Sequence, residues 1–193
     1  MNNKIKGFTL VEVAIVLVII GLIVGAVLKG SVLIESAKYK TFLKSITDYQ
    51  EMVGKFQEKY NALPGDIADV KMRISNSLVA GNSNGRIQGV SEEKNFWLHL
   101  VASGLASGDY SSDPPHHPYP GDGKIKVHWR GAPINKNCLE INGIPALVAK
   151  RLDRDIDDED PTKGSVIKGV STGCVSGGKY KNDDTLCTID IFL

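Results

Sequence analysis

The sequence of 193 residues lacks an excess of either charge, with 23 Lys and Arg against 22 Asp and Glu and a formal net charge of +1. Proteins that bind nucleic acid usually carry a basic surface, so this balance predicts no nucleic-acid partner. No segment repeats with a period of about 20 to 50 residues, which argues against a solenoid. The length suits one domain with a hydrophobic core of its own.

Motifs of catalysis are also missing. The sequence contains no nucleophile motif, no phosphate-binding loop and no metalloprotease spacing. The two adjacent histidines, His116 and His117, lie in a proline-rich segment that we interpret as a surface loop. The sequence therefore predicts that the chain is not an enzyme and has no organic cofactor.

Cysteine is scarce and confined to the last third of the chain, at Cys138, Cys174 and Cys187. None forms a CxxC pair, and no histidine stands at zinc-finger spacing from them. In an oxidising compartment one disulfide is expected, with one thiol left over. Polar, turn-forming residues between Cys174 and Cys187 favour a bridge between these two, but a bridge from Cys138 to either remains open on sequence alone.

Proline is absent before Pro64, and this first third contains the most informative segment of the chain. Residues 8–28 read FTLVEVAIVLVIIGLIVGAVL, close to the roughly 20 apolar residues that cross a bilayer as a helix. The basic residues Lys4 and Lys6 precede it and favour a cytoplasmic N-terminus. A secretory signal peptide is a poorer fit, because the run is too long and no A-x-A site follows.

Glu12 is the residue that an ordinary membrane anchor does not explain. A carboxylate inside an apolar span costs roughly 2.5 to 3.5 kcal/mol on insertion scales. Cleavage after Gly7 would create a positive partner, the new α-amine of Phe8, about 6 Å from Glu12 along a helix axis. A neighbouring copy shifted by that distance would bring its amine opposite Glu12.

The segment Lys6-Gly7-Phe8-Thr9-Leu10-Val11-Glu12 resembles the processing motif of type IV prepilins and pseudopilins. The resemblance implies that a prepilin peptidase cuts after Gly7 and methylates the amine of Phe8, and that Glu12 serves assembly. It also implies other pilin or pseudopilin subunits, the inner membrane and its assembly platform as partners. The expected location is the bacterial inner membrane, and later a periplasmic pseudopilus or a surface pilus. Many pilins have a C-terminal disulfide, which agrees with Cys174–Cys187.

The fold expected from the resemblance is the pilin-like α+β fold, a long N-terminal helix packed on a small antiparallel sheet. We expect a leader at 1–7, a membrane-spanning and assembly helix at 8–28, its amphipathic continuation at 29–60 and a globular domain at 61–193. The continuation is supported by an apolar stripe with helical spacing. The stripe comprises Phe42, Ile46, Tyr49, Val53, Phe56 and Tyr60.

The globular part is predicted from shorter signals. A second helix should begin with Ser91 as its N-cap and end at Gly104 or Gly108. A third should cover 144–152. Strands are expected at 124–130, 138–141, 165–170 and 185–192, and residues 67–89 should be irregular.

Two functions are compared for this chain, a structural subunit and a ligand-binding module. Major pilins of one class often have a kinking proline late in the apolar segment, whereas this chain has Lys29 there, so a minor pilin or a pseudopilin of type II secretion is favoured. The alternative is a tip adhesin or ligand-binding module, which would need an exposed basic or aromatic patch. Loss of Lys4 and Lys6 with the leader changes the net charge to −1, which does not favour DNA uptake.

A run of carboxylates gives a candidate metal site, a calcium site at Asp153, Asp155, Asp157 and Asp158. The run begins like an EF-hand loop but has no glycine at the sixth position and no glutamate at the twelfth. Some pseudopilins bind calcium in a comparable loop. The other interpretation is a solvated acidic helix end paired with neighbouring basic residues.

Overall fold

The computed structural model describes residues 9–111, 113–119, 123–169 and 173–193. The chain divides into two compact units, Met1–Thr41 and Phe42–Leu193. Helix α1 (Leu10–Tyr60) contributes to both, and we describe each unit by itself.

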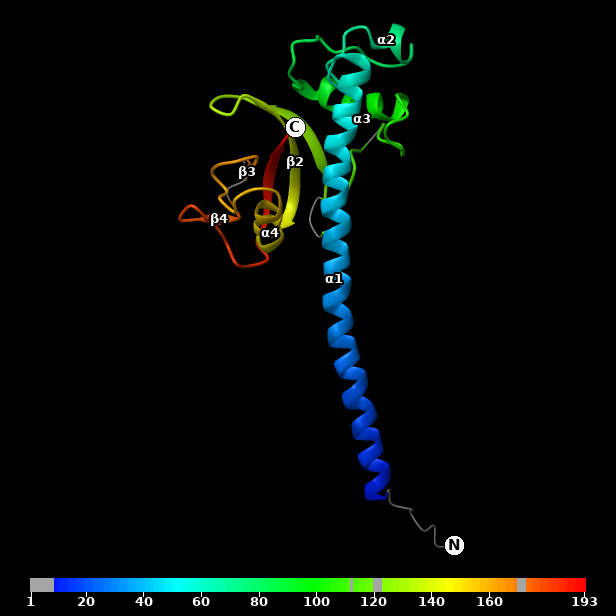
Figure 1. Ribbon diagram of the computed structural model, residues 1–193, viewed down its shortest axis with the longest axis vertical. Helices are drawn as coiled ribbons and strands as arrows, with labels where there is room; N and C mark the ends of the chain where they lie inside the picture. The colour runs from blue at the N-terminus through cyan, green and yellow to red at the C-terminus, as the bar shows by residue number, and fades with distance from the viewer. Residues whose placement is uncertain (1–8, 112, 120–122, 170–172) are drawn as a thin grey trace, which may run out of the picture. The chain divides into compact units, whose positions relative to one another are not determined.

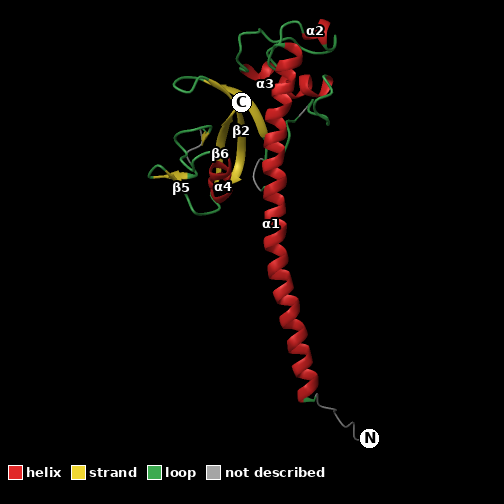
Figure 2. Cartoon of the chain, in the orientation of Figure 1, coloured by secondary structure: helices red, strands yellow, loops and turns green. Residues whose placement is uncertain are grey.

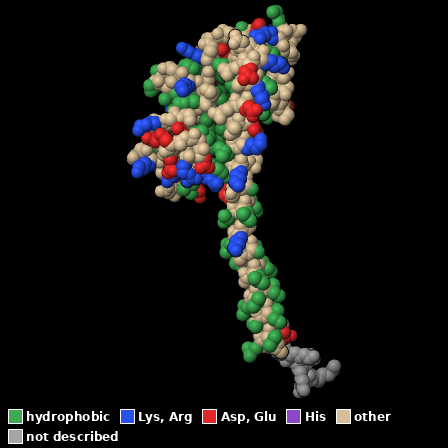
Figure 3. Space-filling view, in the orientation of Figure 1, with side chains coloured by type: hydrophobic (Ala, Val, Ile, Leu, Met, Phe, Trp, Pro, Cys, Tyr) green, Lys and Arg blue, Asp and Glu red, His purple; other side chains and the backbone are tan. Residues whose placement is uncertain are grey.

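The first unit is the N-terminal part of α1, which is one unbroken helix in Figure 1. Apolar side chains such as Leu10, Leu22 and Leu33 are largely exposed along it, and Figure 3 shows hydrophobic side chains at many points along its visible face. Among the described residues, α1 is the one helix long and apolar enough to cross a membrane, and no residue of its most apolar window is buried. The glycines at 21, 25 and 30 do not interrupt it.

In the second unit, the C-terminal part of α1 packs against a sheet, as its stripe predicts. Five stripe residues are buried, and Tyr49 is half-buried with its ring 5.0 Å from that of Trp97. Burial of an aromatic or large aliphatic side chain contributes about 1.5 to 3 kcal/mol, so the stripe holds the helix to the domain.

The sheet is antiparallel and has four strands in the order β1-β2-β6-β3. The strands are β1 (Ile125–Arg130), β2 (Lys136–Pro145), β3 (Val166–Lys168) and β6 (Leu186–Phe192). Figure 2 shows them beside α1, and the register of β2 against β6 shifts between Asn142 and Ile144. Together with the helices they make a mixed α+β fold consistent with the pilin-like fold.

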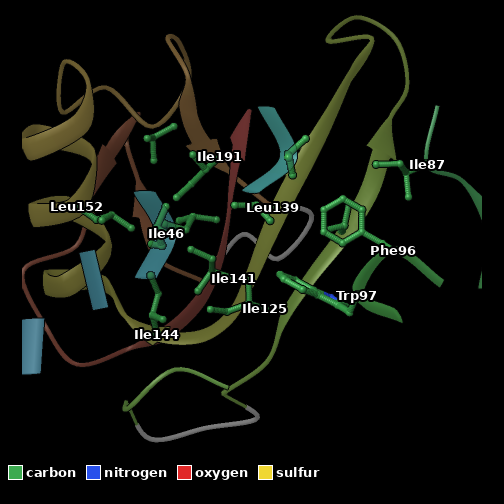
Figure 4. Packing of buried hydrophobic residues seen from close by; sticks show 14 of the residues in the cluster. Ile46, Ile87, Phe96, Trp97, Ile125, Leu139, Ile141, Ile144, Leu152 and Ile191 are labelled. Atoms are coloured by element: carbon green, nitrogen blue, oxygen red, sulfur yellow. The ribbon is translucent and has the colours of Figure 1, made fainter. Parts of the chain in front are cut away.

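Alternate residues of the three longest strands form the hydrophobic core. Figure 4 shows some of them gathered around Ile46 of α1. The core-facing pairs are Ile125 and Val127, Leu139 and Ile141, and Ile189 and Ile191. Side chains alternate between the two faces of a strand. The residue between the two members of each pair therefore lies on the opposite face of the sheet.

Three helices and a hairpin complete the domain. The helices are α2 (Val70–Arg73), α3 (Gly89–Ala102) and α4 (Ala146–Ile156). The hairpin pairs β4 (Val175–Ser176) with β5 (Lys179–Tyr180). Its turn residues, Gly177 and Gly178, both have positive φ, which a two-residue turn of this kind requires.

Several predicted boundaries need correction. Helix α3 begins at Gly89 and its N-cap is Gln88, so Ser91 lies inside the helix, where its hydroxyl accepts from Asn95. The carboxylate of Glu92 accepts the backbone N–H of Gln88, so the helix starts earlier than the predicted N-cap at Ser91. Strand β2 runs from Lys136 to Pro145, and α4 therefore starts at Ala146. Helix α2 and the β4–β5 hairpin were not predicted.

Candidate functional site

Thr9 and Glu12 form a reciprocal capping box at the start of α1. The Glu12 carboxylate accepts hydrogen bonds from the backbone N–H of Thr9 at 2.7 Å and from its hydroxyl at 2.8 Å. The Thr9 hydroxyl in turn accepts the N–H of Glu12 at 3.2 Å. The box satisfies donors that a helix start leaves unpaired, and it gives Glu12 a partner within its own chain.

This box was missed in the sequence analysis, although its signal is present. Thr9-Leu10-Val11-Glu12 has the T-x-x-E spacing of a capping box immediately before an apolar run. Gly7 and Phe8, the predicted processing residues, lie outside the described residues. The cleavage after Gly7, the methylation of Phe8 and the assembly role of Glu12 stay predictions.

The comparison with protein families decides what this N-terminal segment is. Residues 2–28 match the family described as the prokaryotic N-terminal methylation motif. Residues 2–28 carry the signature shared by type IV pilins and pseudopilins. Pilins and pseudopilins with this signature are structural subunits that associate with one another and with a prepilin peptidase. No match was found among curated proteins or among solved structures.

The pilin signature explains the exposed apolar surface of the first unit. A helix with exposed leucine, isoleucine and valine along its length is unstable in water, because a large apolar patch on a soluble protein is unfavourable. A lipid bilayer, or contact with other apolar helices, would cover this surface. The segment thus has the length and apolar composition of a membrane anchor, together with the N-terminal methylation motif.

The thiols of Cys174 and Cys187 come together in the folded domain. All three cysteines are buried thiols, and hydrogen bonding between the thiols of Cys174 and Cys187 lowers the pKa of Cys174 and raises that of Cys187. The two side chains therefore contact each other. The predicted disulfide is not formed in this structure and stays a prediction.

The strand register places Cys138 away from that pair. Cys138 lies opposite Phe192, whereas Cys187 lies opposite Ile144 at the other end of β6. Five residues of strand span about 17 Å, and a disulfide needs Cα atoms within about 7 Å. The geometry therefore favours Cys174–Cys187 over a bridge from Cys138.

The predicted acidic site is only partly assembled. Asp153, Asp157 and Asp158 each offer an oxygen within 4.8 Å of the others. Asp155 does not join them, because its carboxylate contacts the guanidinium of Arg154 at 3.3 Å and lies 3.9 Å from Nε of Arg151. Asp155 was thus wrongly placed with the cluster: it follows Asp153 by two residues on α4, and residues two apart do not share a helix face.

The three clustered carboxylates differ in their surroundings. Asp153 is fully buried, and this burial raises its pKa to about 6, with Asp157 and Asp158 adding to the rise and Tyr180 opposing it. Asp157 accepts the backbone N–H groups of Ser165 and Val166. A Cβ at Gly164 would overlap the Asp157 carboxylate, so glycine is required there. The loop is therefore built around Asp157.

Proposed function

We propose that the chain is a minor pilin or pseudopilin of a type IV pilus or a type II secretion pseudopilus. In this proposal a prepilin peptidase removes residues 1–7 and methylates Phe8. The helix stays in the bacterial inner membrane with its N-terminus in the cytoplasm, and the assembly platform then moves it into the filament. The matched N-terminal motif carries the proposal. The unbroken α1, without a proline in its apolar part, supports a minor subunit.

Glu12 is the residue through which assembly is tested. Replacing it by leucine removes a charge that is unfavourable in lipid, so membrane insertion should be equal or better. Incorporation into sheared filaments should fall at least tenfold, because the Phe8 amine of a neighbouring subunit loses its partner. Glu35→Leu is the matched control, since Glu35 lies on the same helix beyond residues 8–28. Wild-type incorporation of Glu12→Leu would contradict the assembly role.

The globular domain offers no support for a nucleic-acid partner on the face visible in Figure 3. Lys and Arg side chains alternate there with Asp and Glu side chains. Ion pairs such as Lys44–Asp48 and Lys55–Glu51 bring opposite charges together on the helix surface. A domain of this kind suits contacts with other subunits better than a phosphate backbone.

Calcium is the one ligand included in this proposal. It would bind at Asp153, Asp157 and Asp158. Three carboxylates this close together repel one another, and a hard divalent cation with oxygen ligands relieves that repulsion. Calcium should raise the thermal midpoint of the wild-type chain and not that of Asp157→Asn. Asp155→Asn is the matched control, because Asp155 pairs with Arg154 outside the cluster. An equal calcium response in both variants would contradict the site.

A further inference from the structure

The face of the sheet opposite the hydrophobic core holds a cluster of ionisable side chains at its centre. His128 comes from β1, Glu140 from β2 and Asp190 from β6, three strands that are neighbours in the sheet. Glu140 lies directly opposite Asp190 in the register, and His128 lies two residues along β1 from Lys126, the β1 partner of Glu140. Alternation along the strands therefore brings together residues that are far apart in sequence.

The three side chains approach one another closely. Nδ1 of His128 lies 3.6 Å from Oε2 of Glu140, and Nε2 of His128 lies 4.0 Å from Oδ2 of Asp190. One ligand atom from each residue lies within 4.8 Å of the other two. A point between three such atoms is at most ~2.8 Å from each, and zinc ligands bind at about 2.0 to 2.2 Å. Side-chain shifts of under about 1 Å would bring all three into bonding distance.

Asp190 supplies an independent sign that a cation belongs here. Its side chain is fully buried, and within the described part of the chain its Oδ1 has no hydrogen-bond partner. Its Oδ2 contacts the guanidinium of Arg130. A buried carboxylate oxygen without a partner is unfavourable, and such groups are usually paired or bound to metal.

We propose that His128, Glu140 and Asp190 form a binding site for a divalent transition-metal ion of the zinc class. An imidazole nitrogen with two carboxylate oxygens suits zinc, whereas calcium prefers oxygen ligands throughout. The side chains of His128 and Glu140 are 20% and 19% exposed, so a water molecule can complete a four-coordinate site. The ion would join three neighbouring strands of the sheet, β1, β2 and β6.

A second layer of hydrogen bonds holds one ligand in place. Nδ2 of Asn142 donates to Oε1 of Glu140 at 2.8 Å, and the hydroxyl of Thr188 donates to Oδ1 of Asn142 at 2.8 Å. These bonds leave Oε2 of Glu140, the oxygen nearest His128, available for the ion. Support of this kind orients metal ligands and raises affinity.

Arg130 competes with a metal ion for Asp190. Substitution of Arg130 should therefore change metal affinity in the opposite direction to substitution of a ligand. When no metal is bound, the Arg130 guanidinium neutralises the Asp190 carboxylate. When a metal ion binds Asp190, the contact between Arg130 and Oδ2 of Asp190 must be broken or weakened. Removing this positive charge should therefore tighten metal binding, while removal of a ligand should weaken it.

The test uses the full-length chain in detergent micelles, stripped of metal with a chelator. Isothermal titration with Zn²⁺ follows affinity, and the visible absorption of Co²⁺ reports tetrahedral coordination. His128→Gln and Glu140→Gln should each weaken binding at least tenfold and remove the Co²⁺ absorption. Arg130→Gln should tighten binding several-fold. His116→Gln, which alters an exposed histidine paired with Asp113, is the matched control and should bind as wild type.

The acidic cluster at Asp157 could add a second, weaker binding event, so the titrations are repeated in an Asp157→Asn background. Circular dichroism in the presence of chelator shows whether each variant is folded. If His128→Gln does not fold, Glu140→Gln is the ligand variant that tests the site. No zinc binding by the wild type and the Arg130→Gln variant would overturn the proposal. So would binding that His128→Gln and Glu140→Gln leave unchanged.

Discussion

Nδ1 of His99 accepts a hydrogen bond of 2.9 Å from the backbone N–H of Gly65, which lies 34 residues earlier in the chain. Nε2 of the same ring lies 3.0 Å from the carbonyl oxygen of Val79 and donates to it. Only a neutral imidazole can accept at one nitrogen and donate at the other. His99, on α3, thus holds both the turn after α1 and the segment that follows α2.

The pH dependence of stability should report this contact. Burial lowers the pKa of His99 below its ordinary value of 6.5. The unfolded chain therefore binds the proton more readily, so stability is complete above about pH 6.5 and is lost as the pH falls through the lowered pKa. We expect the urea midpoint of the wild type to fall between pH 7 and pH 5 relative to that of a variant without this histidine.

His99→Gln is the control for this prediction, because an amide can accept from Gly65 and donate to Val79 without titrating. Its midpoint should fall less over the same range than that of the wild type. Parallel pH profiles of the two proteins would show that His99 is not responsible.

Thr9 should stabilise the start of α1 through the capping box. Thr9→Val keeps the shape of the side chain but removes the hydroxyl that accepts from Glu12, at a cost of about 1 kcal/mol to the helix start. Amide hydrogen exchange of residues 10–13 in micelles should therefore accelerate about fivefold. Thr9→Ser retains the hydroxyl and should exchange as wild type. If valine and serine exchange alike, the box does not hold the helix end.

Oxidation should join Cys174 to Cys187 and leave Cys138 free. Closing a loop of about 13 residues contributes about 3 kcal/mol in the chain-entropy model. Cys174→Ser and Cys187→Ser should each lower the free energy of unfolding by about that amount, and the double variant should lose no more. Cys138→Ser is the control.

Peptide mapping without reductant identifies the bridge directly. Burial raises the pKa of Cys138 to about 11, so its thiol should react slowly with alkylating reagents in the folded chain at pH 8. A peptide that joins Cys138 to Cys174 or Cys187 would contradict both the pairing and the strand register.

The long helix and its buried stripe could be predicted, because both follow from local patterns. The apolar run and the spacing from Phe42 to Tyr60 are properties of consecutive turns. The bounds of strands β1 and β6 were also predicted to within one residue. The β4–β5 hairpin was missed, since two-residue strands leave almost no periodicity in a sequence.

The sites depended on contacts that no local pattern contains. His99 meets Gly65 across 34 residues, and His128, Glu140 and Asp190 meet only through the register of three strands. The separation of Cys138 from Cys187 also follows from that register. Asp155 was misplaced for the opposite reason: its position in a run of carboxylates hid the face of the helix on which it lies.

Processing at the N-terminus tests the central claim most directly. The full-length chain is co-expressed with a prepilin peptidase, and the membrane fraction is analysed by intact mass and by mapping of the N-terminal peptide. We predict loss of residues 1–7 and a chain that begins with methylated Phe8 and retains the apolar helix. Replacement of Gly7 by a bulky residue should block this change, while Gly7→Ala should slow it only mildly. A chain that keeps Met1, or one cut after the apolar helix, would contradict the account.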